Sequence, residues 1–101
     1  MSKEELINKI RDASEEVNQN FAIKSVKLFG SRAADTARID SDVDLIIEFN
    51  SNAGVGLFAM VEIENIFQRV LKLKTDITTP AGLDEFIRER VLRKAETVYE
   101  R

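Results

Sequence analysis

The sequence predicts an α+β fold in which a small mixed β-sheet carries helices packed on one face. The first observation behind this is the order of periodicities along the chain, which runs helix, strand, strand, helix, strand, helix. The second is the length of 101 residues, enough for one core but not for two domains. The third is that no repeat or linker divides the sequence, so residues 1–101 are expected to form a single domain.

The first half of the chain predicts one helix and two strands. Ser2 followed by Glu5 has the spacing of a capping box, and apolar residues recur at helical intervals over residues 2–17. Ile23–Phe29 and Val43–Phe49 are predicted to be strands, and the second is apolar enough to lie in the centre of a sheet.

The second half predicts helix, strand and helix. Helical periodicity covers Leu57–Leu71, and Lys74–Thr78 is predicted to be a short third strand. Pro80-Ala81-Gly82 then interrupts the chain. A last helix is expected from about residue 83 to residue 99. Its apolar stripe would consist of Leu83, Ile87, Val91, Ala95 and Val98.

Composition excludes several kinds of protein. There is no Cys and no His, so thiolate chemistry and imidazole metal sites are excluded, and any metal must have oxygen ligands, as Mg²⁺ prefers. No apolar run is long enough to span a membrane, and no signal peptide is evident, so a cytoplasmic location is expected. The net charge of −3 argues against strong nucleic-acid binding.

Asp42 and Asp44 flank a single Val where the second strand begins. Residues two apart in a strand point to the same face, and like charges so close repel unless a cation lies between them. If the third strand lies beside the second, Asp76 adds another carboxylate to that face. The pattern favours a divalent metal site, although a solvated strand end, or an edge-strand charge at Asp76, would explain each acid separately.

Gly30 and Ser31 end the first strand, and residues 31–37 are expected to begin a short helical turn. Glycine allows a ligand to approach the backbone closely, and the free N–H groups at a helix start attract phosphate. A phosphate-binding turn beside an acidic metal site suits phosphoryl or nucleotidyl transfer with two metal ions. By itself, however, a Gly-Ser pair after a strand is usually just a turn.

Taken together, Gly30-Ser31, about ten residues, and then Asp42-Val43-Asp44 resemble the signature of the nucleotidyltransferase superfamily that includes DNA polymerase beta. Length and element order are similar to the minimal nucleotidyltransferase domain, the antitoxin-like partner of HEPN-type RNase toxins. The resemblance covers nearly the whole chain.

The resemblance implies a role for each matching residue. Asp42, Asp44 and Asp76 would bind two Mg²⁺ ions, and Asp76 would also help to deprotonate the acceptor hydroxyl. Gly30 and Ser31 would hold the β- and γ-phosphates of a nucleoside triphosphate, here ATP. The acceptor hydroxyl would attack the α-phosphorus and release pyrophosphate.

One departure from the family pattern concerns the residues after Gly30-Ser31-Arg32-Ala33. Ala34 and Asp35 stand where the family often has Arg and Gly, which would weaken triphosphate binding. Arg32 and Arg38 are therefore candidate phosphate ligands. Lys72 and Lys74 are further candidates. Ordinary solvated surface would explain all four cations and is the favoured interpretation for Lys72, whereas Ser31 fixes the location of its neighbour Arg32.

The resemblance also implies a partner. A chain of this length has no room for a domain that grips the acceptor, so a HEPN-type toxin would present it, as a tyrosine hydroxyl that receives AMP. A homodimer or a heteromeric complex is compatible with this. Tyr99 is the only tyrosine of this chain; self-modification is one reading, and packing against a helix is the other.

Three other functions remain open on the sequence. The chain would neutralise a toxin by occlusion if Ala34 and Asp35 reduce its chemistry. It would act on RNA or a small molecule if the acceptor differs. A purely structural domain would leave the three Asp residues without a role.

Overall fold

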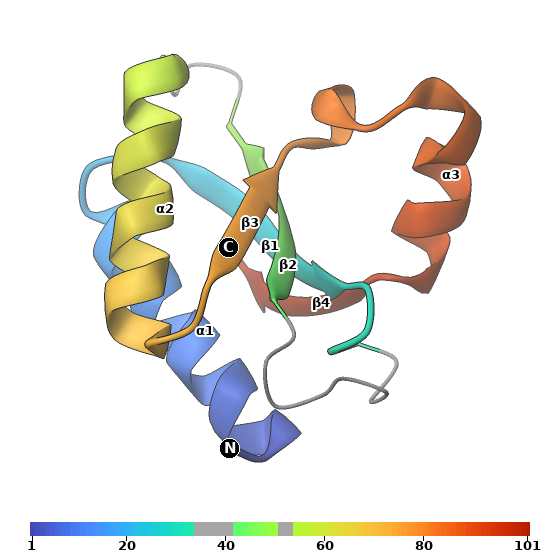
Figure 1. Cartoon of the computed structure of the whole chain (residues 1–101). Coiled ribbons are helices and arrows are strands. Elements are labelled where there is room, and N and C mark those ends of the chain that lie inside the picture. Colours follow the sequence, from blue (N-terminus) through green and yellow to red (C-terminus); the bar gives the residue numbers. More distant parts are fainter. Residues whose placement is uncertain (34–41, 51–53) are drawn as a thin grey trace.

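A computed structural model of the chain describes residues 1–33, 42–50 and 54–101. The elements agree with the predicted order as far as the third strand (Figure 1). They are α1 (Lys3–Asn18), β1 (Ile23–Phe29), β2 (Val43–Phe49), α2 (Leu57–Leu71), β3 (Thr75–Thr78), a 3₁₀ turn η1 (Pro80–Gly82), α3 (Glu85–Lys94) and β4 (Glu96–Glu100).

The sheet is mixed, as predicted, with the strand order β3-β2-β1-β4. β1 lies between β2 and β4 and is antiparallel to both. β3 is parallel to β2, and α2 makes the crossover between them. β2 is therefore a central strand, which accounts for its apolar sequence.

The hydrophobic core lies between one face of the sheet and the helices α1 and α2. Alternate strand residues face it, including Leu28 of β1 and Val43, Leu45 and Ile47 of β2. Leu6 and Ile10 of α1 and Phe67 of α2 cover them and are almost completely buried. Helices α1 and α2 thus cover the same face of the sheet. The strand residues that alternate with the core-facing ones point to the opposite face.

The third helix lies on the other side of the sheet (Figure 1). Its Leu92 lines a small cavity with Pro80 of η1 and with Lys27 and Ile46, which belong to the face turned away from α1 and α2. Arg88 donates hydrogen bonds to the carbonyl oxygens of Pro80 (2.8 Å) and Leu83 (3.0 Å), which attach α3 to the η1 segment. None of the residues of α3 is fully buried.

The predicted helix to residue 99 is wrong. α3 ends at Lys94, and residues 96–100 form β4 on the edge of β1. Val98 and Tyr99 are buried there, and Arg11 of α1 donates a hydrogen bond to the Val98 carbonyl (2.8 Å). Pairing with β4 satisfies backbone groups of β1 that a longer helix would leave unpaired at the sheet edge. The helical spacing of Ala95 and Val98 was coincidental.

The predicted start of the first helix is confirmed. The Ser2 hydroxyl accepts a hydrogen bond from the Glu5 backbone N–H (3.1 Å), so Ser2 is the N-cap of α1. Within the described ranges, none of the helices combines the length and apolar character needed to cross a membrane.

Candidate active site

Three carboxylates lie on the face of the sheet turned away from α1 and α2. Val43 and Leu45 point into the core, so the alternating Asp44 points to the opposite face. The parallel register pairs Asp44 with Asp76 directly across β2 and β3. Asp42 comes immediately before β2, two residues from Asp44. The predicted proximity of the second and third strands is thus what brings these acids together.

The electrostatics of Asp44 reflect this arrangement. Its pKa is raised above the usual value of 3.8, first because the half-buried carboxylate loses solvent, and then because Asp76 and Asp42 repel its charge. Lys74 places its ammonium 3.8 Å from a carboxylate oxygen of Asp42. That ion pair is exposed to solvent, so it offsets little of the negative charge.

The donor set fits a hard divalent cation that also binds a phosphate ligand. Across residues 1–33, 42–50 and 54–101, no group of three or more potential ligands is tight enough to hold a metal ion alone. Mg²⁺, however, is commonly bound by one or two carboxylates while substrate phosphates and water complete its coordination. The mutual repulsion at Asp44 is what such a cation would relieve.

Gly30 ends β1 directly against Asp44. Its φ is +74°, in the left-handed region, and a Cβ at this position would lie 2.6 Å from Asp44 Oδ2. The preceding residue, Phe29, is the cross-strand partner of Asp44. The backbone conformation therefore favours glycine here, and a larger residue would also displace the Asp44 carboxylate. The sequence predicted such an approach for a ligand but not for Asp44.

Ser31 and Arg32 follow in a turn that is half-buried and adjoins the carboxylates through Gly30. Lys3 of α1 donates a hydrogen bond to the Ala33 carbonyl (3.0 Å), which ties this turn to the body of the protein. The candidate phosphate ligand Arg38 lies outside the described residues. The same is true of Ala34 and Asp35.

The family model described as "Nucleotidyltransferase domain" matches residues 10–98. The chain belongs to this family. That membership agrees with the geometry, because residues 10–98 contain Gly30, Ser31 and all three carboxylates.

Two similar proteins match this nucleotidyltransferase over nearly its whole length. The protein adenylyltransferase MntA of Thermococcus cleftensis is 28% identical over 98% of this chain and 96% of its own. A solved structure assigned as a minimal nucleotidyltransferase is 33% identical, covers 94% of both chains and superposes with a TM-score of 0.77.

A third similarity concerns the fold alone. The complex of a tri-AMPylated HEPN toxin from Shewanella oneidensis with an MNT antitoxin contains a chain with a TM-score of 0.71 to this one. Sequence identity is 14%, and the match covers 99% of this chain and 74% of the other.

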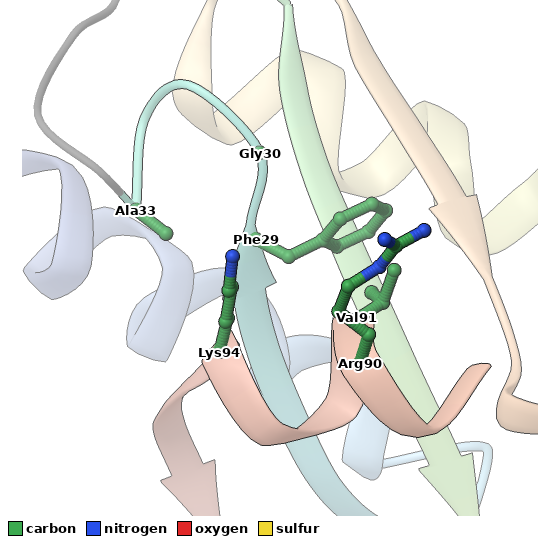
Figure 2. A pocket seen from close by; sticks show the side chains of 6 residues that line it. All are labelled: Phe29, Gly30, Ala33, Arg90, Val91 and Lys94. Carbon is green, nitrogen blue, oxygen red and sulfur yellow. The ribbon is translucent and has the colours of Figure 1, made fainter. Parts of the chain in front are cut away.

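Sequence reasoning missed a pocket of this nucleotidyltransferase that adjoins Gly30. Its volume is about 320 Å³ (Figure 2). The lining residues are Phe29, Gly30, Ala33, Arg90, Val91 and Lys94. The i, i+4 spacing of Arg90 and Lys94 was the available signal, but it does not indicate which face of the sheet a helix will cover.

Tyr99 is a structural residue. It is 8% exposed, and its hydroxyl donates a hydrogen bond to Glu15 of α1 (3.0 Å). The interpretation of Tyr99 as packed on a helix is therefore confirmed, although it lies in β4. This burial makes it a poor acceptor for AMP.

We expect Tyr99→Phe to lower the free energy of unfolding by about 0.5–1.5 kcal/mol, the usual worth of one such hydrogen bond. Chemical denaturation would measure this loss. Nucleotidyl transfer should be unchanged, since the hydroxyl lies on the α1 side of the sheet. A variant that lost transfer at full stability would contradict the structural role.

Proposed function

We propose that this nucleotidyltransferase transfers AMP from ATP to a hydroxyl group, most simply a tyrosine, of a HEPN-type toxin and thereby acts as its antitoxin. The observation that carries the proposal is the convergence of Asp42, Asp44 and Asp76 on one sheet face beside the Gly30 turn. The full-length similarity to a protein adenylyltransferase supports this choice of reaction. The MNT–HEPN complex supports this choice of partner.

The proposed reaction exchanges a phosphoanhydride bond of ATP for a phosphoester bond to the acceptor. The acceptor oxygen forms a bond to the α-phosphorus of ATP, the bond from the α-phosphorus to the bridging oxygen of the β-phosphate breaks, and pyrophosphate leaves. Asp76 is exposed at the edge strand, so it is placed to take the acceptor proton. That proton then passes to water, and the toxin carries AMP as a phosphodiester.

The remaining residues bind and orient. Gly30 and Ser31 would hold the triphosphate by their backbone N–H groups, with Arg32 and Arg38 as further cationic ligands. Asp42, Asp44 and Asp76 would hold two Mg²⁺ ions, which when bound supply charge neutralisation and activation of the attacking oxygen. The proposal places this reaction in the cytoplasm, where ATP and Mg²⁺ are both available.

The test is intact-mass spectrometry of this protein mixed with the product of its neighbouring gene, Mg²⁺ and ATP. We expect the partner to gain whole AMP units. Asp42→Asn should reduce the rate of this gain by at least about 100-fold, because it removes one of the carboxylates that would hold the Mg²⁺ ions, whose charge would stabilise the triphosphate.

Asp12→Asn is the matched control, because it makes the same change on an exposed part of α1, away from the site. It should modify the partner at the wild-type rate. Equal modification by Asp42→Asn would contradict the proposal. A stable complex without any mass gain would instead favour neutralisation by occlusion.

A further inference from the structure

Helix α3 places two basic side chains in the pocket beside Gly30. Arg90 and Lys94 are one helical turn apart, and both line the pocket together with Phe29 and Val91 (Figure 2). In Figure 2 the Lys94 side chain extends toward the turn between Gly30 and Ala33, and the Arg90 guanidinium lies beside the Phe29 ring. The pocket is therefore lined by both apolar and cationic side chains.

These two cations differ from their neighbours on the same helix. Arg88 is bonded to two carbonyl oxygens, and Arg93 forms an ion pair with Glu89 (2.7 Å). In the part of the chain that the structure describes, Arg90 and Lys94 make no hydrogen bond or ion pair. Like charges at i and i+4 destabilise a helix slightly. A bound anion would remove that repulsion.

The position of the pocket limits what the anion can be. Phe29 pairs with Asp44 across the sheet, and a Cβ added at Gly30 would lie 2.6 Å from the Asp44 carboxylate. The pocket thus opens on the same face as the three carboxylates and shares the Gly30 turn with them. A ligand that reaches from the carboxylates to Arg90 and Lys94 would pass this turn, and the two cations favour negative charge at its far end.

We propose that Arg90 and Lys94 bind the terminal phosphates of the donor nucleoside triphosphate, as a cationic wall that faces the Gly30 turn. That the polyphosphate belongs to a nucleotide rests on the proposed function. A nucleobase could also stack on Phe29 and Arg90, and inorganic tripolyphosphate, which has no base, distinguishes these two occupants.

The proposal also predicts a preference for triphosphates over monophosphates. A monophosphate bound at the carboxylates would not reach α3, so its affinity would not depend on Arg90 or Lys94. A triphosphate would reach both. Together these residues would act as specificity-determining residues for the length of the phosphate chain.

The experiment measures binding rather than transfer, by calorimetry with Mg²⁺ and three probes: ATP, AMP and inorganic tripolyphosphate. Arg90→Gln and Lys94→Gln should each weaken ATP and tripolyphosphate binding about 5- to 30-fold. AMP affinity should be unchanged. Lys94→Arg should restore most of the lost affinity, because it keeps the charge.

Arg93→Gln is the control, since it removes a cation of the same helix that lies outside the pocket. It should bind all three probes as the wild type does. Both substituted side chains are exposed, and melting temperatures measured without ligand would show that the variants remain folded.

The outcomes separate this inference from the proposed function. Unchanged ATP and tripolyphosphate affinity in Arg90→Gln and Lys94→Gln would overturn the inference, even if the protein transfers AMP normally. Tripolyphosphate binding that depends on both residues would support it, even if no AMP transfer is found. An equal loss of AMP affinity would also overturn it, because the contact would then not be to the terminal phosphates.

Discussion

Asp44→Asn should abolish nucleotidyl transfer and, without divalent cations, raise the melting temperature of the protein. The carboxylate lies half-buried between Asp42 and Asp76, so its charge destabilises the metal-free fold. Asn keeps the shape and removes the charge. We expect transfer to fall by at least about 100-fold. Stability should rise by up to about 0.5 kcal/mol, or roughly 2–4 °C in a domain of this size.

The pH dependence follows from the direction of the pKa shift. Because the pKa of Asp44 is raised in the folded protein, the folded state binds this proton more tightly than the unfolded state does. The Asp44 contribution to stability therefore falls as the pH rises from 3.8 through the raised pKa. At pH values above the raised pKa, the Asp44 charge destabilises the fold to its full extent. At pH values below 3.8, Asp44 is protonated in both states, and the wild type and Asp44→Asn should melt at the same temperature.

The measurement is a pair of melting curves recorded in EDTA over a range of pH and then with Mg²⁺ at neutral pH. Added Mg²⁺ with ATP should stabilise the wild type and leave Asp44→Asn nearly unchanged, since only the wild type has the full donor set. Asp12→Asn again provides the same substitution on α1. If Asp44→Asn melted below the wild type in EDTA at neutral pH, the electrostatic account of this site would be wrong.

Gly30→Ala should impair both stability and transfer. Alanine at φ +74° adds backbone strain of about 1–3 kcal/mol, and its Cβ would lie 2.6 Å from Asp44 Oδ2. Either Asp44 or the end of β1 must then move. A displacement of about 1 Å at a reacting centre is enough to reduce the rate about 100-fold. Denaturant unfolding and the mass-spectrometric assay would measure the two effects separately.

Gly54→Ala is the control that separates backbone strain at a positive φ from displacement of Asp44. Gly54 also has a positive φ, +63°, but a Cβ there would meet no atom within 4 Å. We expect Gly54→Ala to lose a similar amount of stability through strain and to keep wild-type transfer. Equal transfer rates in both variants would mean that the close approach of Gly30 to Asp44 has no catalytic consequence.

Much of the candidate site could be predicted because its residues are close in sequence. Asp42 and Asp44 are two apart at a strand start, and strand geometry alone assigns them to one face. Gly30 and Ser31 follow a strand whose end is signalled by the glycine itself. Asp76 required one further assumption, that the third strand lies beside the second, and the parallel register of β2 and β3 confirms it.

The last strand shows where local pattern fails. Residues 96–100 contain the β-branched Thr97 and Val98 and the aromatic Tyr99, yet Val98 also continued a helical stripe. Whether these residues form a helix or a strand depended on the edge of β1, where the backbone N–H and C=O groups need a partner. Residues 96–100 supply that partner as β4. Periodicity describes one segment, whereas strand pairing is a property of two.

The amino-acid order was sufficient for the α+β class, for the Gly-Ser and Asp-Val-Asp pairs and for the chemistry that they indicate, because these depend on short-range geometry. Three features depended on segments far apart in the chain. These are the position of Gly30 beside Asp44, the pairing of Asp44 with Asp76, and the approach of Arg90 and Lys94 to the Gly30 turn. Each is fixed by how the sheet orders its strands and by which face α3 covers. Those choices minimise the exposed apolar surface and the unpaired backbone groups of the whole domain, and no single segment contains that information.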